Sequence, residues 1–267
     1  MKSIYRFAAH SLLATACLAF LPTMKAVGPP PDGGYANRNT AEGTDALLNL
    51  NTGTDNTAVG YIALQNNAFG NFNTATGAYA LSLNNFGSGN TAHGYNALGA
   101  NTTGLANTAQ GKDALAANTT GSVNTASGDV ALAFNTSGSA NTASGANALA
   151  GNTTGSSNTA DGYGALFANA MGGANTASGY NALSSNSTGS YNIAFGYQAG
   201  INLTTGDNNI DIGNAGSPRE SAHIRIGTRG THNDTTIAGL LGTTVPTRRP
   251  PPDPTTRQPL PPPSSAP

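Results

Sequence analysis

The side chains that most often carry chemistry are few in this sequence, and none is spaced for it. After residue 26 the only histidines are His93, His223 and His232, and none of them has metal-ligand spacing or a thiol partner. Serines that share one repeat position, such as Ser127 and Ser144, have no base in register with them. The acidic residues are scattered and lack the glycine-rich nonapeptide pattern of calcium-binding β-rolls. We therefore expect no catalytic residue, no metal site and no cofactor, and we do not expect an enzyme.

The N-terminal segment is typical of a secretory signal. Lys2 and Arg6 precede an apolar run over residues 7–21, which predicts a signal peptide over residues 1–26. The apolar run is short for a membrane span, so we expect no transmembrane anchor in the mature chain. The only cysteine, Cys17, lies inside this run, and the sequence Ala-Thr-Ala-Cys that ends there leaves a lipoprotein signal as an alternative. We expect an exported protein, secreted or at the cell surface, without disulfides.

Composition and charge exclude some classes of partner. The chain contains 35 glycines, no tryptophan and only 9% charged residues, which is unlike an ordinary globular domain and unlike a charged disordered chain. Between Asn39 and Ser217 the only Lys or Arg is Lys112, and it stands against eight acidic residues. Because nucleic-acid binding needs clustered Lys or Arg, we expect no nucleic-acid partner.

The dominant feature of the sequence is a short repeat whose first residue, an asparagine, recurs at every seventeenth position. Its consensus is N-T-A-x-G-x-x-A-L-x-x-N-x-x-G-x-x, and the repeat positions are numbered in this order. Ten copies run without insertion over residues 39–208, after a linker over residues 27–38, and Asn, Ala, Gly, Ala and Gly are invariant at positions 1, 3, 5, 8 and 15. Such an array indicates a solenoid with one coil per repeat. The asparagines at position 1 are Asn39, Asn56, Asn73, Asn90, Asn107, Asn124, Asn141, Asn158, Asn175, Asn192 and Asn209.

The pattern within each copy predicts an all-β parallel solenoid. Asn-Thr-Ala-x-Gly alternates as a short strand does, with Ala at position 3 and Gly at position 5 facing inward and position 4 facing outward. We expect Ala-Leu at positions 8 and 9 to start a return strand, Gly at position 15 to turn the chain, and the asparagines at position 1 to form a ladder. One leucine per coil cannot offset the conformational entropy that is lost when the whole coil is ordered, so the coils must stack. The leucines expected in the core include Leu115, Leu132, Leu149, Leu166 and Leu183.

The repeat resembles the head repeats of trimeric autotransporter adhesins of the YadA type. The match is closest at Asn192-Ile-Ala-Phe-Gly196 and Asn209-Ile-Asp-Ile-Gly213, and the resemblance covers about residues 39–245. Similar repeats are found in bacterial surface proteins and phage tail-fibre-like proteins. The resemblance implies a left-handed parallel β-roll that associates side by side as a homotrimer and serves adhesion.

The C-terminal part of the sequence differs from the ten copies. Residues 209–245 are richer in apolar residues, and Gly227 follows Gly213 sooner than the period of the repeat requires, which predicts a cap or a trimer seam. Residues 246–267 are rich in proline and predict a disordered tail of polyproline type. The residues of the possible seam are Ile193, Phe195, Ile210, Ile212, Ile224 and Ile226.

Two outward columns could bind a ligand. Position 6 is tyrosine in five copies, and these side chains form either a contact strip for glycan or protein, or cross-coil stacks that only stabilise the sheet. Position 2 is threonine in nine copies, a regular array of the kind that ice-binding solenoids use. We expect an exported structural or adhesive protein for surface display, with a ligand-binding module on one of these columns as the alternative. The tyrosines are Tyr61, Tyr95, Tyr163, Tyr180 and Tyr197.

Overall fold

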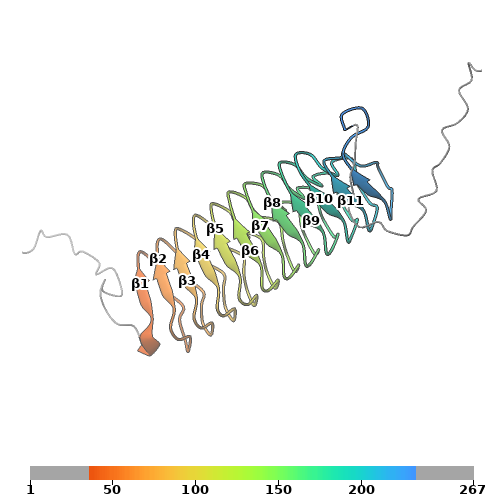
Figure 1. Ribbon diagram of the computed structural model, residues 1–267. Coiled ribbons are helices and arrows are strands. Elements are labelled where there is room, and N and C mark those ends of the chain that lie inside the picture. The colour runs from red at the N-terminus through yellow and green to blue at the C-terminus, as the bar shows by residue number, and fades with distance from the viewer. Residues whose placement is uncertain (1–35, 233–267) are drawn as a thin grey trace, which may run out of the picture. The chain divides into compact units, whose positions relative to one another are not determined.

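Each copy of the repeat forms one coil that contains a single three-residue strand (Figure 1). The computed structural model describes residues 36–232, and coil 1 begins at Asn39. A short 3-10 helix, η1 (Ala36–Arg38), precedes the first strand. The strands are β1 (Thr40–Glu42), β2 (Thr57–Val59), β3 (Thr74–Thr76), β4 (Thr91–His93), β5 (Thr108–Gln110), β6 (Thr125–Ser127), β7 (Thr142–Ser144), β8 (Thr159–Asp161), β9 (Thr176–Ser178), β10 (Ile193–Phe195), β11 (Ile210–Ile212) and β12 (Ile224–Ile226).

The strands stack in chain order into one parallel sheet of 12 strands. Every strand residue pairs with its equivalent in the next copy of the repeat, as Thr108 does with Thr125, so that each repeat position forms a column along the sheet. The sequence spacing between the paired residues of β11 and β12 is shorter than in the other pairs, because Ile210 pairs with Ile224. The all-β parallel solenoid predicted from the repeat is confirmed.

The core consists of three columns of small or aliphatic side chains. The alanines at positions 3 and 8 and the leucines at position 9 are buried in every full coil that carries them. Coil 10 has Gly200 at position 9, and its leucine stands instead at position 12, where Leu203 is fully buried. The structure places Leu115, Leu132, Leu149, Leu166 and Leu183 in this core with no exposed surface.

The predicted return strand at positions 8 and 9 is wrong. This part of each coil is a series of tight turns, and the leucine at position 9 has a left-handed backbone, as at Leu115 with φ of 53°. The turn is held from two sides, since Leu115 N donates to Ala131 O in the next coil and Asn118 N donates to Leu115 O. Small residues fit a tight turn as well as a strand, so alternation alone could not distinguish the two.

Glycine at position 5 was predicted to face inward within the strand, but the strand ends before it. It follows the strand with a positive φ, as Gly145 does with φ of 126°, and so it does not share the alternation that buries alanine at position 3. A Cβ at Gly145 would lie 2.7 Å from the carbonyl oxygen of Gly162 in the next coil. The close stacking of successive backbones, together with the left-handed conformation, therefore excludes a side chain here.

Two buried asparagine ladders run along the solenoid. At position 1, Asn124 donates from Nδ2 to Asn107 Oδ1 at 3.1 Å and to Gly138 O at 2.9 Å, and this pattern recurs through most coils. The second ladder, at position 12, was not predicted, although asparagine recurs there in eight of the ten copies. In it, Asn118 Nδ2 donates to Asn101 Oδ1 at 2.8 Å and to Gly121 O at 3.0 Å. Each ladder satisfies amides that would otherwise be costly to bury.

Several predicted segments lie outside the described residues. These are the signal peptide at 1–26, the linker up to residue 35, the end of the 209–245 segment after residue 232, and the tail at 246–267. The described coils belong to one compact unit that ends at Thr231. Within residues 36–232, no helix has the length and apolar character needed to cross a membrane.

Candidate functional site

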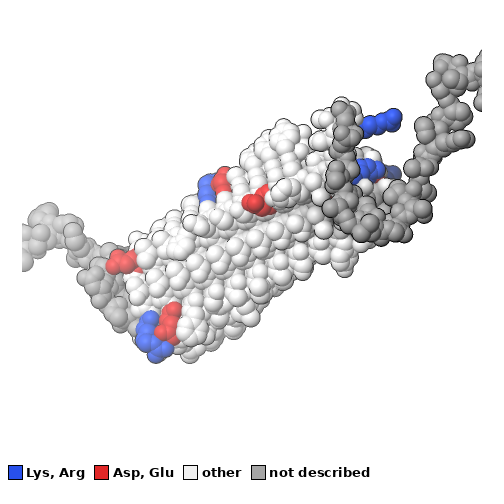
Figure 2. Space-filling view, viewed as in Figure 1, with Lys and Arg blue, Asp and Glu red and all other residues white. Residues whose placement is uncertain are grey.

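The outer face of the sheet changes character along the solenoid. In each strand the middle residue faces inward, and the first and third residues, at positions 2 and 4, face outward. From β1 to β9 the first is always threonine, which gives the predicted threonine column, while position 4 is mixed. Few charged side chains are visible in Figure 2, and two ion pairs, Arg38 with Asp55 and Lys112 with Asp113, account for the lysine and one of the arginines among the described residues.

The three last strands replace this polar face by an apolar array. Parallel pairing aligns Ile193, Ile210 and Ile224 in one column and Phe195, Ile212 and Ile226 in the next. Phe195 is 61% exposed and Ile224 is 70% exposed, so these side chains form a continuous apolar surface on β10, β11 and β12. We call these six residues the seam array.

The five predicted tyrosines fall into two separate groups. Tyr163, Tyr180 and Tyr197 stack face to face on consecutive coils, with ring centroids 5.4 Å apart at both steps. Tyr61 and Tyr95 lie two coils apart and are connected edge to face through Tyr79, which stands at position 7 and was not predicted. All five predicted tyrosines remain about half exposed or more. The structure therefore brings three of them together and leaves the other two in a distant cluster.

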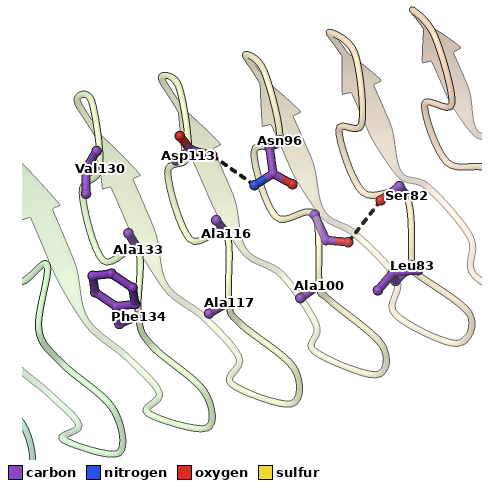
Figure 3. Close-up of a pocket in the computed structure, with 11 residues that line it drawn as sticks. Ser82, Leu83, Asn96, Ala100, Asp113, Ala116, Ala117, Val130, Ala133 and Phe134 are labelled. Carbon is purple, nitrogen blue, oxygen red and sulfur yellow. Dashed lines mark hydrogen bonds between the residues drawn. The ribbon is translucent and has the colours of Figure 1, made fainter.

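A lengthwise furrow crosses coils 3 to 6 on the turn side of the solenoid (Figure 3). Leu83 stands at one end and Phe134 at the other, and the alanines and glycine at positions 10 and 11 of the coils between them form the floor. The furrow has a volume of about 680 Å³. Along its edge Asn96 Nδ2 donates to Asp113 Oδ1 at 2.8 Å, and hydrogen bonds from Lys112 and Asn96 lower the pKa of Asp113. Sequence analysis missed this furrow, because only the stacked coils show where small residues leave a gap.

An ionic cluster closes the core at the C-terminal end of the described chain. Asp211 and Arg225 stand in the inward column that alanine fills in the ten copies, and Asp211 is fully buried. Glu220 accepts a hydrogen bond from Arg225 and another from Ser217 N at 2.8 Å. Burial, and next the charge of Glu220, raise the pKa of Asp211 to about 6, while Arg225 and His223 act in the opposite direction. The replacement of alanine by Asp211 at position 3 was visible in the sequence, but it did not show that the carboxyl group of Asp211 would be buried.

Glu220 occupies a position that glycine holds in the coils before it. Asn209 Nδ2 donates to Glu220 O at 2.8 Å, in the same way that Asn192 Nδ2 donates to Gly206 O. In earlier coils a Cβ at this position would meet the carbonyl oxygen of the next coil, as at Gly53 and Gly70. Coil 11 carries a side chain here, and that side chain pairs with Arg225 at the C-terminal end of the described core.

The histidines lie apart from one another. His93 is exposed at the outward position 4 of β4, and His223 Nδ1 lies 2.8 Å from Ser221 O. Within residues 36–232, no three His, Cys, Asp or Glu side chains come close enough together to hold a metal ion.

No known protein-family model, curated protein or solved structure matches this chain. The candidate surfaces are the seam array, the stacked tyrosines and the turn-side furrow between Leu83 and Phe134.

Proposed function

We propose that this chain is an exported, non-enzymatic rod that serves surface display or cell adhesion. The proposal is supported by the architecture, because 12 strands in one parallel sheet, at about 4.8 Å spacing, extend over roughly 50 Å. The resemblance of Asn-Thr-Ala-x-Gly to the YadA-type head motif supports the adhesive role. Export rests on the signal predicted at residues 1–26.

The seam array supports the further proposal that three copies associate. An apolar surface of six neighbouring side chains is unusual on a soluble monomer and marks an interface. The array lies at the end of a sheet whose other outward positions are mainly polar, so association begins at β10–β12. Side-by-side contact of three such arrays would cover the exposed rings and isoleucines.

Light scattering on the full chain tests the homotrimer. We expect a trimer mass for the unmodified chain and a monomer mass after Ile212→Asp with Ile226→Asp. The matched control is Ser127→Asp with Ser144→Asp, which places carboxylates at the same outward repeat position on the neighbouring strands β6 and β7 and should leave the trimer intact. A monomeric unmodified chain would overturn the proposed association.

Export can be measured separately from association. Expression of the full chain in a secreting bacterial host should yield, outside the cytoplasm, a protein that begins near residue 27 by mass. Recovery of the uncleaved chain from the cytoplasm alone would contradict export and leave the fold unaffected.

The alternative function is a ligand-binding module on the tyrosine column. The observation in its favour is the exposed stack of Tyr163, Tyr180 and Tyr197. Tyr163 also lines a hollow of about 540 Å³, together with Asn147 and Phe167. Tyr-to-Ser substitution at all three positions would abolish adhesion to a target surface if the column binds it. A spacer would keep its function after this change and after exchange of whole coils. The threonine column as an ice-binding face is tested by thermal hysteresis.

A further inference from the structure

A second furrow lies on the turn side of coils 1 to 4, away from the seam array and the tyrosine columns. Position 12 points into the core in these coils, so the side chains at positions 11, 13 and 14 stand on either side of it. Asn49, Asn66 and Leu83 form one wall, and Asn85, Phe86 and Thr102 lie opposite. The furrow is open to solvent and has a volume of about 660 Å³, within the usual range of ligand pockets.

One wall of this furrow carries a fixed aromatic ring. Phe86 stacks on Phe69 of the preceding coil, with ring centroids 5.0 Å apart and planes within 8°. The next residue in the same column is Thr103, which is small and also lines the furrow, so no third ring covers the other side of Phe86. Phe86 is 55% exposed and Leu83 is 51% exposed. The furrow therefore presents an exposed apolar surface whose aromatic ring is fixed in orientation by stacking.

Amide and hydroxyl groups lie beside this apolar surface. Asn49 Nδ2 donates to Asn66 Oδ1 at 2.8 Å, and Asn66 Nδ2 donates to Ser82 O at 3.0 Å, which orients both amides along the furrow. Asn85 Oδ1 is shielded from solvent and has no hydrogen-bond partner within residues 36–232. A buried acceptor without a partner is costly, and rotation of the Asn85 amide toward a ligand hydroxyl would satisfy it.

The furrow is electrically neutral. None of its lining residues is charged, and Lys112 is the only Lys or Arg between Arg38 and Arg219. A sulfated, phosphorylated or carboxylated ligand would find no cation to pair with, and a cationic ligand would find no carboxylate in the wall. The ligand that fits is uncharged, has an apolar face, and carries both donors and acceptors at its edge.

We propose that this furrow binds a neutral oligosaccharide. A sugar ring presents a face of C–H groups, which packs on the free face of Phe86 and on Leu83, and a rim of hydroxyl groups, which exchange hydrogen bonds with side-chain amides. The lining residues come from coils 1 to 4, so the furrow follows the solenoid over several coils. An extended chain of sugars matches that shape better than a compact molecule does. The site does not depend on the seam array or on trimer formation.

Calorimetry on the full chain tests the proposal with a panel of neutral hexasaccharides, namely β-1,4-glucan, α-1,4-glucan, β-1,3-glucan, β-1,4-linked N-acetylglucosamine, mannan and galactan fragments. We expect at least one to bind with a Kd below about 1 mM. Phe86→Ala should weaken that binding by at least about tenfold, and Phe86→Tyr should retain it. Asn85→Ala should weaken it by roughly fivefold through the lost hydrogen bond.

Controls separate the furrow from the other surfaces and from loss of fold. Phe86 is exposed, so its substitution removes no core packing, and the thermal midpoint of each variant should match that of the unmodified chain. Tyr180→Ser, on the tyrosine column, should bind the same hexasaccharide unchanged. A panel without a binder at about 10 mM would overturn the proposal. So would binding that survives Phe86→Ala, or binding that Tyr180→Ser abolishes.

Discussion

Asp211 and Arg225 are cross-strand partners on β11 and β12, yet Arg225 pairs with Glu220, and neither carboxylate oxygen of Asp211 has a hydrogen-bond partner within residues 36–232. The end of the core therefore contains two carboxyl groups and one guanidinium. Asp211 has no exposed surface, and its burial favours the protonated form of its carboxyl group.

The stability of the last coils should consequently depend on pH. Burial raises the pKa of Asp211 from 3.8 to about 6, so the folded state keeps a proton that the unfolded chain releases. The resulting stabilisation is fully present below about pH 4 and is lost as the pH rises through about 6, a change of at most about 3 kcal/mol. We expect the thermal midpoint of the unmodified chain to fall over this interval relative to that of Asp211→Asn, whose amide stays neutral. Parallel curves for the two proteins would contradict this assignment.

A single core leucine should be essential to the coupling of neighbouring coils. Leu132→Ala removes a fully buried side chain from a core that has one leucine per coil, and we expect a loss of about 2–5 kcal/mol in unfolding free energy. Because each coil contacts only its neighbours, the cavity should also broaden the denaturant transition. The matched control is Leu105→Ala, since Leu105 is 48% exposed and should cost less than about 0.5 kcal/mol. Equal losses at both sites would show that position 9 does not carry the core.

The second asparagine ladder can be tested by an isosteric change. Asn135 Nδ2 donates to Asn118 Oδ1 at 2.7 Å and to Gly138 O at 2.9 Å inside the solenoid. Asn135→Asp replaces this donor by a carboxylate facing two acceptors, whereas Asn135→Ala removes the group and leaves its partners unpaired. We expect about 1–3 kcal/mol for the alanine variant and a larger loss for the aspartate variant at neutral pH. The aspartate variant should recover part of its stability below about pH 4, when its carboxyl is protonated and can donate.

Glycine at position 5 should tolerate no side chain in coils 1 to 9, where an added Cβ would clash with the backbone of the next coil. Gly128 has φ of 141°, and an added Cβ would lie 2.5 Å from Gly145 O and 2.9 Å from Ala146 N. Gly128→Ala should therefore prevent coils 6 and 7 from stacking and abolish cooperative unfolding. Gly213, at the same position of coil 11, also has a positive φ, but an added Cβ there would have no atom within 4 Å. Gly213→Ala should cost only about 1 kcal/mol, the strain of the left-handed conformation. Equal effects of the two changes would show that contact between coils is not the reason for glycine.

The fold class and its columns could be derived from the sequence because the repeat is free of insertions. A constant period sets the pairing of each residue with its equivalent in the next coil, so Asn124 had to stand against Asn107 and Ile210 against Ile193. Ile224 departs from the period, and only the structure pairs it with Ile210. Position 5 was expected to face inward within the strand, whereas its glycine follows the strand and lies close to the backbone of the next coil. The return strand was predicted wrongly because Ala-Leu fits both a strand and a left-handed turn.

The sequence by itself determined the ten full coils, the register between them and the polar or apolar character of their outward columns, since these follow from periodicity alone. The register of β12, which departs from the period, was decided by the structure. Only the tertiary structure decided where the turns direct their side chains. It placed Asn118 and its equivalents inside the core, opened the furrow beside Phe86, and buried Asp211 beneath Glu220 and Arg225. The physical reason is that the direction of a turn residue depends on backbone hydrogen bonds to the adjacent coil, and those contacts exist only once the coils are stacked.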